Sequence, residues 1–391
     1  MVVERGTVSR ASHDLFRTQS AITRSIRDLE HTLALSLFER HSNGMLLTDI
    51  GKCILPRAQR ALVELNQIPA LLNRLQQQDA RRREDTEPIW LFNVRRLQIF
   101  LHLYDLNHTQ SVANTLGITQ PAVSAALKVL GKGAGVALFQ RTPKGMMPTP
   151  AGREIAANIS RALNELRHIP EDIAARQGML TGTVHVGALP LSRARLLPQA
   201  LIKLISRHPG IKVVTNESAF SALITELRAG NIDFIIGALR KEEKLLEIQN
   251  EVLFEEELIL LARPQHPLAG RQVLKQDLRK IQWVLPRETA PSRFLLEQAL
   301  QIMGVEPPHP VVESGDPAVV RALLLGSDMV AAVSSHQLDY EVSAGILMPL
   351  RINLVATRRE IGLTFRQGAL LSPAAAALVR CVHEVIPSET I

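Results

Sequence analysis

The chain has 391 residues, 46% of them hydrophobic and 4% aromatic, which is too long for one core and excludes fibrous, disordered and small disulfide-stapled proteins. Its formal net charge of +7 lies entirely in residues 1–178, where 23 Lys and Arg face 16 Asp and Glu, because residues 179–391 hold 22 of each. This distribution of charge predicts a polyanionic partner for residues 1–178 and a different function for the neutral residues 179–391.

Residues near the start of the chain recur at a constant offset of 101 residues without a gap. The matching pairs are Thr18/Thr119, Gln19/Gln120, Ala21/Ala122, Leu37/Leu138, Phe38/Phe139, Arg40/Arg141, Gly44/Gly145, Met45/Met146, Thr48/Thr149 and Gly51/Gly152. Two copies are too few for a solenoid, so the pattern indicates a duplicated domain. By this offset, Met1 aligns with a position inside the first predicted helix of the second copy. The start of the first copy is therefore expected to be truncated or wrongly assigned.

Within each copy, the apolar periodicity predicts a helix, a short turn and a second helix. In the second copy, the apolar residues of 97–106 recur on one helical face. Residues 111–117 follow as a short helix that ends at glycine, and Thr119 then caps a further helix with Pro121 in its first turn. This order is typical of a helix-turn-helix, whose capped helix enters the DNA major groove.

Two short strands are predicted after each capped helix. In the second copy, residues 138–141 and 146–149 flank the turn Pro143-Lys144-Gly145 and would form a wing. Any three-helix bundle shares part of this pattern, but the same cap, turn and wing residues occur in both copies. We therefore expect two winged helix-turn-helix domains, both rich in α-helix.

The exposed side of each capped helix carries the candidate base-reading residues. Arg24 can bind guanine through two hydrogen bonds, whereas Ala125, at the matching position of the second copy, can only touch a thymine methyl group. The two copies are therefore expected to read different half-sites. The candidate DNA-binding residues on these helices are Gln19, Ser20, Thr23, Arg24, Arg27, Gln120, Pro121, Ser124 and Lys128. In the wings, Arg40, Arg141 and Lys144 are expected to contact phosphates, with an internal salt bridge as the alternative for both arginines.

A longer helix is predicted after each wing. Its apolar residues alternate steps of four and three over residues 54–75, and residues 155–173 repeat the register. This spacing indicates a coiled-coil seam, and the alternative is an amphipathic helix packed on its own domain. Residues 76–88, which contain a run of three arginines, are predicted to be a polar hinge.

These residues resemble the LysR-type bacterial transcriptional regulators, whose winged helix-turn-helix ends in a Leu-Phe-x-Arg wing followed by a Thr-x-x-Gly helix start. The resemblance covers essentially the whole chain and implies a transcriptional regulator that binds double-stranded DNA. The sequence departs from the family in one respect. The family has one winged helix-turn-helix domain, or head, per chain, whereas this sequence has two.

The duplication also changes the expected assembly. LysR-like regulators pair two chains through the linker helix, so that two heads face successive major grooves. Here we expect the two linker helices of one chain to pair antiparallel, so that each chain mimics a family dimer. A homodimer of this chain would then present four heads, and a tetramer with eight heads is the alternative.

From residue 181 the pattern changes to alternating strands and helices, which requires parallel sheets with crossover helices. Two such sets, with crossings near 258–262 and 346–349, predict an α/β domain of two lobes that resembles periplasmic binding proteins, the fold of LysR-type effector domains. The predicted boundaries are 1–52 for the first winged helix-turn-helix, 53–88 for its linker helix and hinge, 89–152 for the second winged helix-turn-helix, 153–178 for its linker helix, and 179–391 for the effector domain. Its lobe I spans about 179–261 and 346–391, and its lobe II about 262–345.

A small-molecule effector is expected between the lobes, at loops that leave the carboxyl ends of strands. The candidate effector-binding residues are Ser192, Arg193, Thr289, Ser292, Arg293, Ser335 and Arg366. Ser292 stands where helix amides can hold an anion, and Arg293 adds a bidentate donor. The alternative for these residues is an ordinary structural role, because serines often cap helices and loops are often rich in proline. The loops 189–193 and 286–293 resemble those of the LysR branch that includes galactose-binding-protein regulators, which implies a sugar or a small carboxylate.

The sequence predicts no catalysis, no metal site and no cofactor. Gly326-Ser327-Asp328 lacks the second glycine of a nucleophile elbow, and the 12 histidines show no His-x-x-x-His or Cys-His spacing. Cys53 and Cys381 are too few for a disulfide framework and suit a reducing cytoplasm, and no apolar run approaches the ~18 residues that span a membrane. A solute-binding protein of the same fold is the main alternative function, and the first residues do not have the pattern of the signal peptide that would favour it. An enzyme on this fold is a more distant third.

Overall fold

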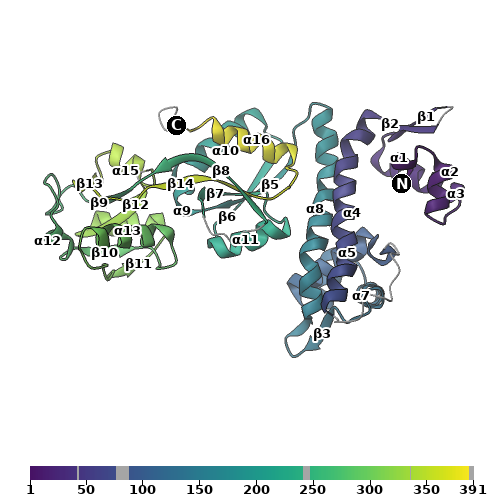
Figure 1. The fold of residues 1–391 in the computed structure, drawn as a ribbon, viewed down its shortest axis with the longest axis horizontal. Coiled ribbons are helices and arrows are strands. Elements are labelled where there is room, and N and C mark those ends of the chain that lie inside the picture. Colours follow the sequence, from purple (N-terminus) through teal and green to yellow (C-terminus); the bar gives the residue numbers. More distant parts are fainter. Residues whose placement is uncertain (42–43, 76–87, 241–246, 335, 387–391) are drawn as a thin grey trace. The chain divides into compact units, whose positions relative to one another are not determined.

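The computed structural model describes residues 1–41, 44–75, 88–240, 247–334 and 336–386, which form two compact units (Figure 1). The first unit is Met1–Gly182 with Ala229–Asn231, and the second begins at Thr183 and contains the rest of the described chain. Most of the predicted hinge, Ser335 and the side chain of Arg40 lie outside the described part. No helix in the described part is both long and apolar enough to cross a membrane.

The first unit contains the two predicted copies of the winged helix-turn-helix. The elements of the first copy are α1 (Val2–Arg5), α2 (Val8–Asp14), α3 (Gln19–Leu33), β1 (Phe38–His41), β2 (Gly44–Leu47) and the linker helix α4 (Asp49–Leu75). The second copy follows the 3-10 turn Ile89–Leu91 and comprises α5 (Val94–Leu106), α6 (Thr109–Leu116), α7 (Gln120–Ala134), β3 (Phe139–Thr142), β4 (Gly145–Pro148) and the linker helix α8 (Pro150–Arg176). Each wing is an antiparallel pair of strands, β1 with β2 and β3 with β4.

The second copy has a closed core. Its fully enclosed residues are Ile99, Leu103, Val112, Ala113 and Val123. Phe139 of the wing packs against this core, and its ring meets that of Phe100 edge-on with centroids 5.1 Å apart. Gly117 ends α6 in the left-handed conformation, at φ 62°, as the sequence predicted.

The helix start at Thr119 is correctly predicted in position, but the predicted hydroxyl cap is absent. Thr119 has the extended backbone of an N-cap residue, yet its side chain accepts no capping hydrogen bond. The amide of Ala122 donates instead to the Thr119 carbonyl, at 3.0 Å. In the first copy the Thr18 hydroxyl does accept a hydrogen bond, from the amide of Ala21 at 3.2 Å.

The first copy repeats this arrangement with a shorter first helix. The offset aligns α1 with only the last four residues of α5. Gly6 ends α1 and Asn107 ends α5, both in the left-handed conformation. The Met45 amide donates to the Gly6 carbonyl at 3.0 Å, and the Met146 amide donates to the Asn107 carbonyl at 2.7 Å. Each wing is therefore docked on the end of its first helix in the same way.

The linker helices α4 and α8 lie side by side and antiparallel (Figure 1). Cys53, in the first turns of α4, contacts the carbonyl of Asp172, near the end of α8. Asn158, in the first half of α8, bonds to Gln67, in the second half of α4. The apolar positions of α4 that join the core with α5, α7 and α8 are Ala61, Leu65, Ile68 and Leu72. The two predicted seam helices of one chain thus pair with each other, and α8 also packs on its own domain through α5.

The second unit contains two mixed sheets of five strands each, in the orders β6-β5-β7-β14-β8 and β11-β10-β12-β9-β13. Its strands are β5 (Gly182–Ala188), β6 (Ile211–Asn216), β7 (Phe234–Ala238), β8 (Ile248–Glu256), β9 (Leu258–Ala262), β10 (Gln282–Leu285), β11 (Val312–Glu313), β12 (Met329–Ser334), β13 (Met348–Pro349) and β14 (Arg359–Arg366). Its helices are α9 (Pro190–Ala194), α10 (Leu196–Arg207), α11 (Phe220–Ala229), α12 (Lys275–Leu278), α13 (Pro291–Ile302), α14 (Pro317–Gly326), α15 (Asp339–Ser343) and α16 (Pro373–His383).

Parallel pairing is found as predicted between β5 and β7 and between β10 and its neighbours β11 and β12. The strands that arrive from the other lobe run the opposite way: β14 is antiparallel to β7 and β8, and β9 is antiparallel to β12. A strand that enters a sheet from the far side begins at the opposite end, which accounts for this mixture.

The crossings between the lobes differ from the predicted boundaries by a few residues. The sequence placed 258–261 and 346–349 in lobe I, but β9 and β13 both belong to the second sheet, where Met348 pairs with Ala262. The chain therefore leaves the first sheet after Glu256 and returns between Pro349 and Arg359. A short apolar strand carries no signal of which sheet it joins, because that depends on its partners.

Candidate DNA-binding and effector-binding sites

Helix α3 presents the candidate base-reading side chains of the first copy. They are exposed at Gln19, Ser20, Arg24 and Arg27 and half-buried at Thr23. The Arg24 side chain is 85% exposed, and its contact with the exposed carboxylate of Asp28 is long, at 4.0 Å. The Gln19 amide donates to the Ser9 hydroxyl at 3.2 Å, which ties α3 to the preceding helix. Arg24 is therefore available for an external ligand.

Helix α7 presents a different set in the second copy. The exposed positions are Pro121, Ser124, Ala125 and Lys128, and Gln120 is half-buried. The Gln120 amide donates to the Ser124 hydroxyl at 3.0 Å. Lys128 forms no ion pair with any residue that the structure describes, so its charge faces solvent.

The second wing carries exposed cations at and beside its turn. Arg141 is exposed and makes no ion pair within the described part of the chain, so the internal salt bridge considered for it is absent. Lys144 is exposed in the turn between β3 and β4, and its amide donates to the Thr142 hydroxyl at 3.2 Å. The backbone of Arg40 pairs with Met45 within the first wing.

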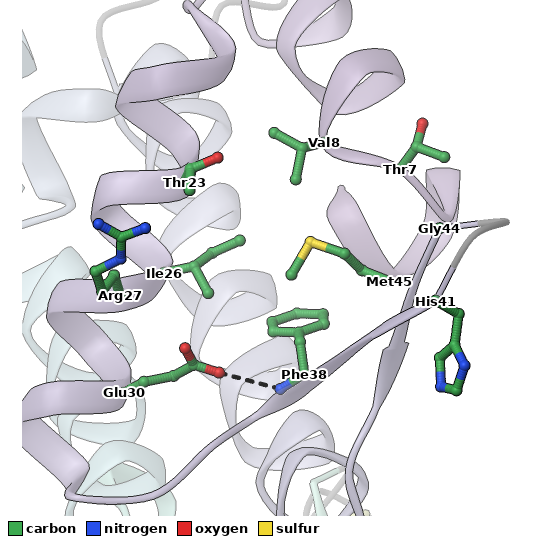
Figure 2. Close-up of a pocket in the computed structure, with 10 residues that line it drawn as sticks. All are labelled: Thr7, Val8, Thr23, Ile26, Arg27, Glu30, Phe38, His41, Gly44 and Met45. Atoms are coloured by element: carbon green, nitrogen blue, oxygen red, sulfur yellow. Dashed lines mark hydrogen bonds between the residues drawn. The ribbon is translucent and has the colours of Figure 1, made fainter.

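A pocket of about 470 Å³ opens in the first head (Figure 2). Its lining residues come from α2, α3 and the wing: Thr7, Val8, Thr23, Ile26, Arg27, Glu30, Phe38, His41, Gly44 and Met45. In Figure 2, Val8, Ile26, Phe38 and Met45 gather around the cavity, and the Glu30 carboxylate accepts the Phe38 amide at its base, at 3.1 Å.

The second copy explains this pocket. At the positions that match Ile26, Phe38 and Met45, it packs its own side chains against a core that includes Ile99 of α5. The offset gives residues 94–101, the first two turns of α5, no counterpart among residues 1–52. The pocket is therefore the place that those two turns fill in the second copy. Thr23 and Arg27, two candidate DNA-binding residues, stand on its wall.

The loop after β5 contains two candidate effector residues with different surroundings. Ser192 is fully buried, and its hydroxyl donates toward the carbonyls of Leu189, at 2.8 Å, and Ile236, at 3.1 Å. Its hydroxyl hydrogen is therefore committed to holding the turn into α9. Arg193 is half-buried, and its Nε is enclosed without a hydrogen-bond partner in the described structure.

The loop after β10 contains the second predicted cluster. Thr289 is exposed, and Ser292 is half-buried in the first turn of α13. Arg293 is buried, and its guanidinium donates to Glu297 and, at 3.0 Å, to the Pro308 carbonyl. Within the described structure its Nη1 lacks a partner. The side chain thus anchors α13 to the following loop.

A buried polar link between the two sheets was missed by the sequence reasoning. Glu256, the last residue of β8, is buried and accepts a hydrogen bond from Arg359 Nε at 2.8 Å and another from the Ser334 hydroxyl, at the end of β12. Arg366, at the end of β14, is half-buried. The only signal in the sequence was a run of three glutamates, residues 255–257, before the predicted crossing, and it did not single out Glu256.

Residues 177–387 match the family model for the LysR substrate binding domain, and residues 1–52 and 94–153 match that for bacterial regulatory helix-turn-helix proteins of the lysR family. The chain is 50% identical over 388 residues to the HTH-type transcriptional regulator GalR of Pseudomonas putida, covering 99% of this chain and 96% of that protein. It is 27% identical to the HTH-type transcriptional regulator PcaQ of Agrobacterium fabrum, over 74% of this chain and 94% of that one.

Two solved structures share the fold. A full-length variant of OxyR from Pseudomonas aeruginosa superposes with a TM-score of 0.58 at 21% identity, covering 75% of this chain and 97% of that one. Full-length CbnR complexed with its target DNA superposes with a TM-score of 0.54 at 22% identity, covering 75% of this chain and 99% of that one. The match to GalR spans both heads, whereas these two structures match about three quarters of the chain.

The helix-turn-helix domains, the two-lobed α/β domain and these matches define a DNA-binding transcriptional regulator with an effector-binding domain, and not an enzyme. The chain belongs to the LysR family.

Proposed function

We propose that one chain of this LysR-family regulator reads its operator with two unlike heads and responds to a small anionic metabolite bound between its two lobes. The observation that carries the first part is the presence of two exposed recognition helices whose linker helices pair within one chain. The five matching positions of these helices are Gln19/Gln120, Ser20/Pro121, Thr23/Ser124, Arg24/Ala125 and Arg27/Lys128. Four of the five pairs differ, so the two heads present different hydrogen-bonding groups to the bases.

Unlike heads on one chain imply an operator with direction. A family dimer of identical heads suits a palindrome, because its two-fold symmetry matches that of the DNA. The two heads proposed here would require two different half-sites in a fixed order. The wing cations Arg141 and Lys144 would position the second head on the backbone without reading sequence.

A gel-shift and footprinting experiment tests this function. The protein's own upstream intergenic DNA is the first probe, and the half-sites found by footprinting are then exchanged in order. We expect the native order to bind at least tenfold more tightly than the exchanged order. Equal affinity for both orders, or binding that survives when either half-site is scrambled, would contradict the reading by two heads.

For the effector, we favour a small carboxylate and keep a sugar as the second candidate, as implied by the galactose-binding-protein branch. Arg193 supports an anion because it follows the carboxyl end of β5 and has an enclosed Nε without a partner in the described structure. Ser292 supports it from the other lobe, since it lies in the first turn of α13, where backbone amides and the helix dipole favour negative charge.

Thermal shifts with a panel of small carboxylates and neutral sugars test the site. We expect a carboxylate to raise the Tm of the wild type and of the surface control Arg207→Gln, and to leave that of Arg193→Gln unchanged. Arg293→Ala is expected to lose the response while basal DNA binding persists. If the shift in Arg193→Gln equals that of the wild type, the site is misplaced, and if only sugars shift the wild type, the carboxylate assignment is wrong.

A further inference from the structure

The facing surfaces of α4 and α8 contain a buried network of charges between the apolar positions. Arg57 of α4 is 1% exposed. Its Nε donates to Asp172 of α8 at 2.9 Å, and its Nη1 donates to Glu165 at 2.9 Å. Burial alone would lower the pKa of Arg57, but the hydrogen bonds to Asp172 and Glu165 outweigh it and raise the pKa above its usual value. The guanidinium therefore stays charged inside the seam.

Part of this network obeys the internal repeat. The offset makes Arg60 the counterpart of Arg161 and Glu64 the counterpart of Glu165. Arg60 bonds to Glu165 at 3.0 Å, and Arg161 bonds to Glu64 at 2.8 Å. These are the same pair seen twice, related by the pseudo-two-fold axis of the antiparallel helices. Such pairs would form equally well between two copies of α4 or two copies of α8.

The remaining part breaks the symmetry. The counterpart of Arg57 is Asn158, and the counterpart of Asp172 is Leu71. If α4 paired with another α4 in the same register, Arg57 would meet Leu71 where it now meets Asp172. If α8 paired with another α8, Asp172 would meet Asn158 and lose its cation. In the α4 pair, Arg57 would lose one of its two carboxylates and keep only Glu64, the counterpart of Glu165. In the α8 pair, Asp172, whose side chain is 12% exposed, would be left without a cation in the seam, which is destabilising.

We propose that the Arg57–Asp172 pair makes α4 join α8 and keeps either helix from pairing with a second copy of itself. The connection of α4 and α8 within one chain then favours that α8 over the α8 of another chain, through its high effective concentration. In this role the pair resembles the single polar residues that set pairing and register in coiled coils at a cost in stability. The proposal concerns the seam alone, and its tests do not depend on DNA or effector binding.

The first test asks whether the two residues are coupled. Both variants are made in the full chain. Arg57→Asn gives α4 the residue found at the matching position of α8, and Asp172→Leu gives α8 the residue found at the matching position of α4. Each single variant should lower the unfolding midpoint of the seam by roughly 5–15 °C, and the double variant should lose clearly less than the sum, because neither charge is then stranded. The control Arg167→Asn, on the exposed side of α8, should change it little. Additive losses would show that the pair selects nothing.

The second test separates pairing within the chain from exchange of helices between chains. The Arg57→Asn chain and an isotope-labelled Asp172→Leu chain are unfolded, mixed and refolded together, and hydrogen exchange is followed by mass spectrometry. An interchain seam would join the intact α4 of one variant to the intact α8 of the other and restore slow exchange in those two helices. We expect no such rescue, with each variant exchanging as it does alone. Rescue in the mixture would overturn the intrachain pairing.

Discussion

At the scale of single residues, Arg24 distinguishes the two recognition helices most clearly. Its guanidinium is exposed, and Ala125 occupies the same position in the second head. Arg24→Ala should cost about 1–3 kcal/mol of binding free energy on the half-site read by the first head. Fluorescence anisotropy with matched and scrambled half-sites checks this. Equal losses on both DNAs would identify Arg24 as a phosphate contact.

Lys144 is expected to act through charge alone. Because it is exposed at the turn of the second wing, neutralising it should reduce the slope of log affinity against log salt by about one unit. The comparison is Lys144→Ala against Lys212→Ala, which removes an exposed lysine on β6 in the other unit. An unchanged slope in Lys144→Ala would place this lysine away from DNA.

Gly145 controls how the second wing meets the head. Its φ is +111°, and a Cβ there would lie 2.4 Å from the carbonyl oxygen of Asn107, which accepts the amide of Met146. Gly145→Ala should therefore destabilise the head by about 1–3 kcal/mol. Gly131→Ala within α7 is the control, since a Cβ there meets nothing closer than 3.6 Å, and it should be neutral or stabilising by up to ~1 kcal/mol. Thermal unfolding measures the change in stability of both variants. A similar loss of stability in Gly145→Ala and Gly131→Ala would contradict this role of Gly145.

At the scale of elements, the short helix α12 depends on one carboxylate. The hydrogen bonds from Arg271, at 2.9 and 3.0 Å, and from the Leu274 amide, at 2.9 Å, lower the pKa of Asp277 to about 2. A lowered folded-state pKa means that this contribution to stability is complete above the unfolded value near 4 and is lost as the pH falls towards 2. The Leu274 amide signal should therefore titrate near pH 2 by NMR and lose this step in Asp277→Asn. A midpoint near pH 4 would show that the bonds do not form in solution.

The elements show how far the sequence could lead. The helices and wings of both heads were predictable because glycine stops, threonine caps and apolar periodicity are local signals that occur twice at one offset. The pairing of α4 with α8 was also predicted, from two apolar stripes in matching register. Arg57 and Asp172 were not, because a buried charge looks like a surface charge until its partner, 115 residues away, is placed beside it.

The candidate effector site shows the same limit. The sequence correctly located the loops after β5 and β10, since strand ends follow from the alternation of strands and helices. It could not show that the Ser192 hydroxyl is committed to backbone carbonyls or that Glu297 and Pro308 engage Arg293. Those partners are set by packing, and they make Arg193 the sharper candidate of the two arginines.

At the scale of the whole molecule, pairing within the chain determines the expected assembly. The helix that LysR-like regulators use to join two chains is here occupied by the chain's own second linker helix. A dimer of chains would then present four heads, and we expect light scattering after gel filtration to give a mass near two chains. A mass near four chains would favour the arrangement in which like helices pair between chains.

The covalent connection of the two heads, which runs through α4 and the residues after it, also changes how the regulator responds to dilution. When two heads come from separate chains that dissociate, the number of paired heads falls with the square of the chain concentration. With both heads on one chain, the number falls only in proportion to it, since the second head remains at a high effective concentration beside the first. A cell that holds a few copies of this chain would still have as many head pairs as chains. A given relative change in the number of chains would then produce the same relative change in the number of head pairs, and not its square.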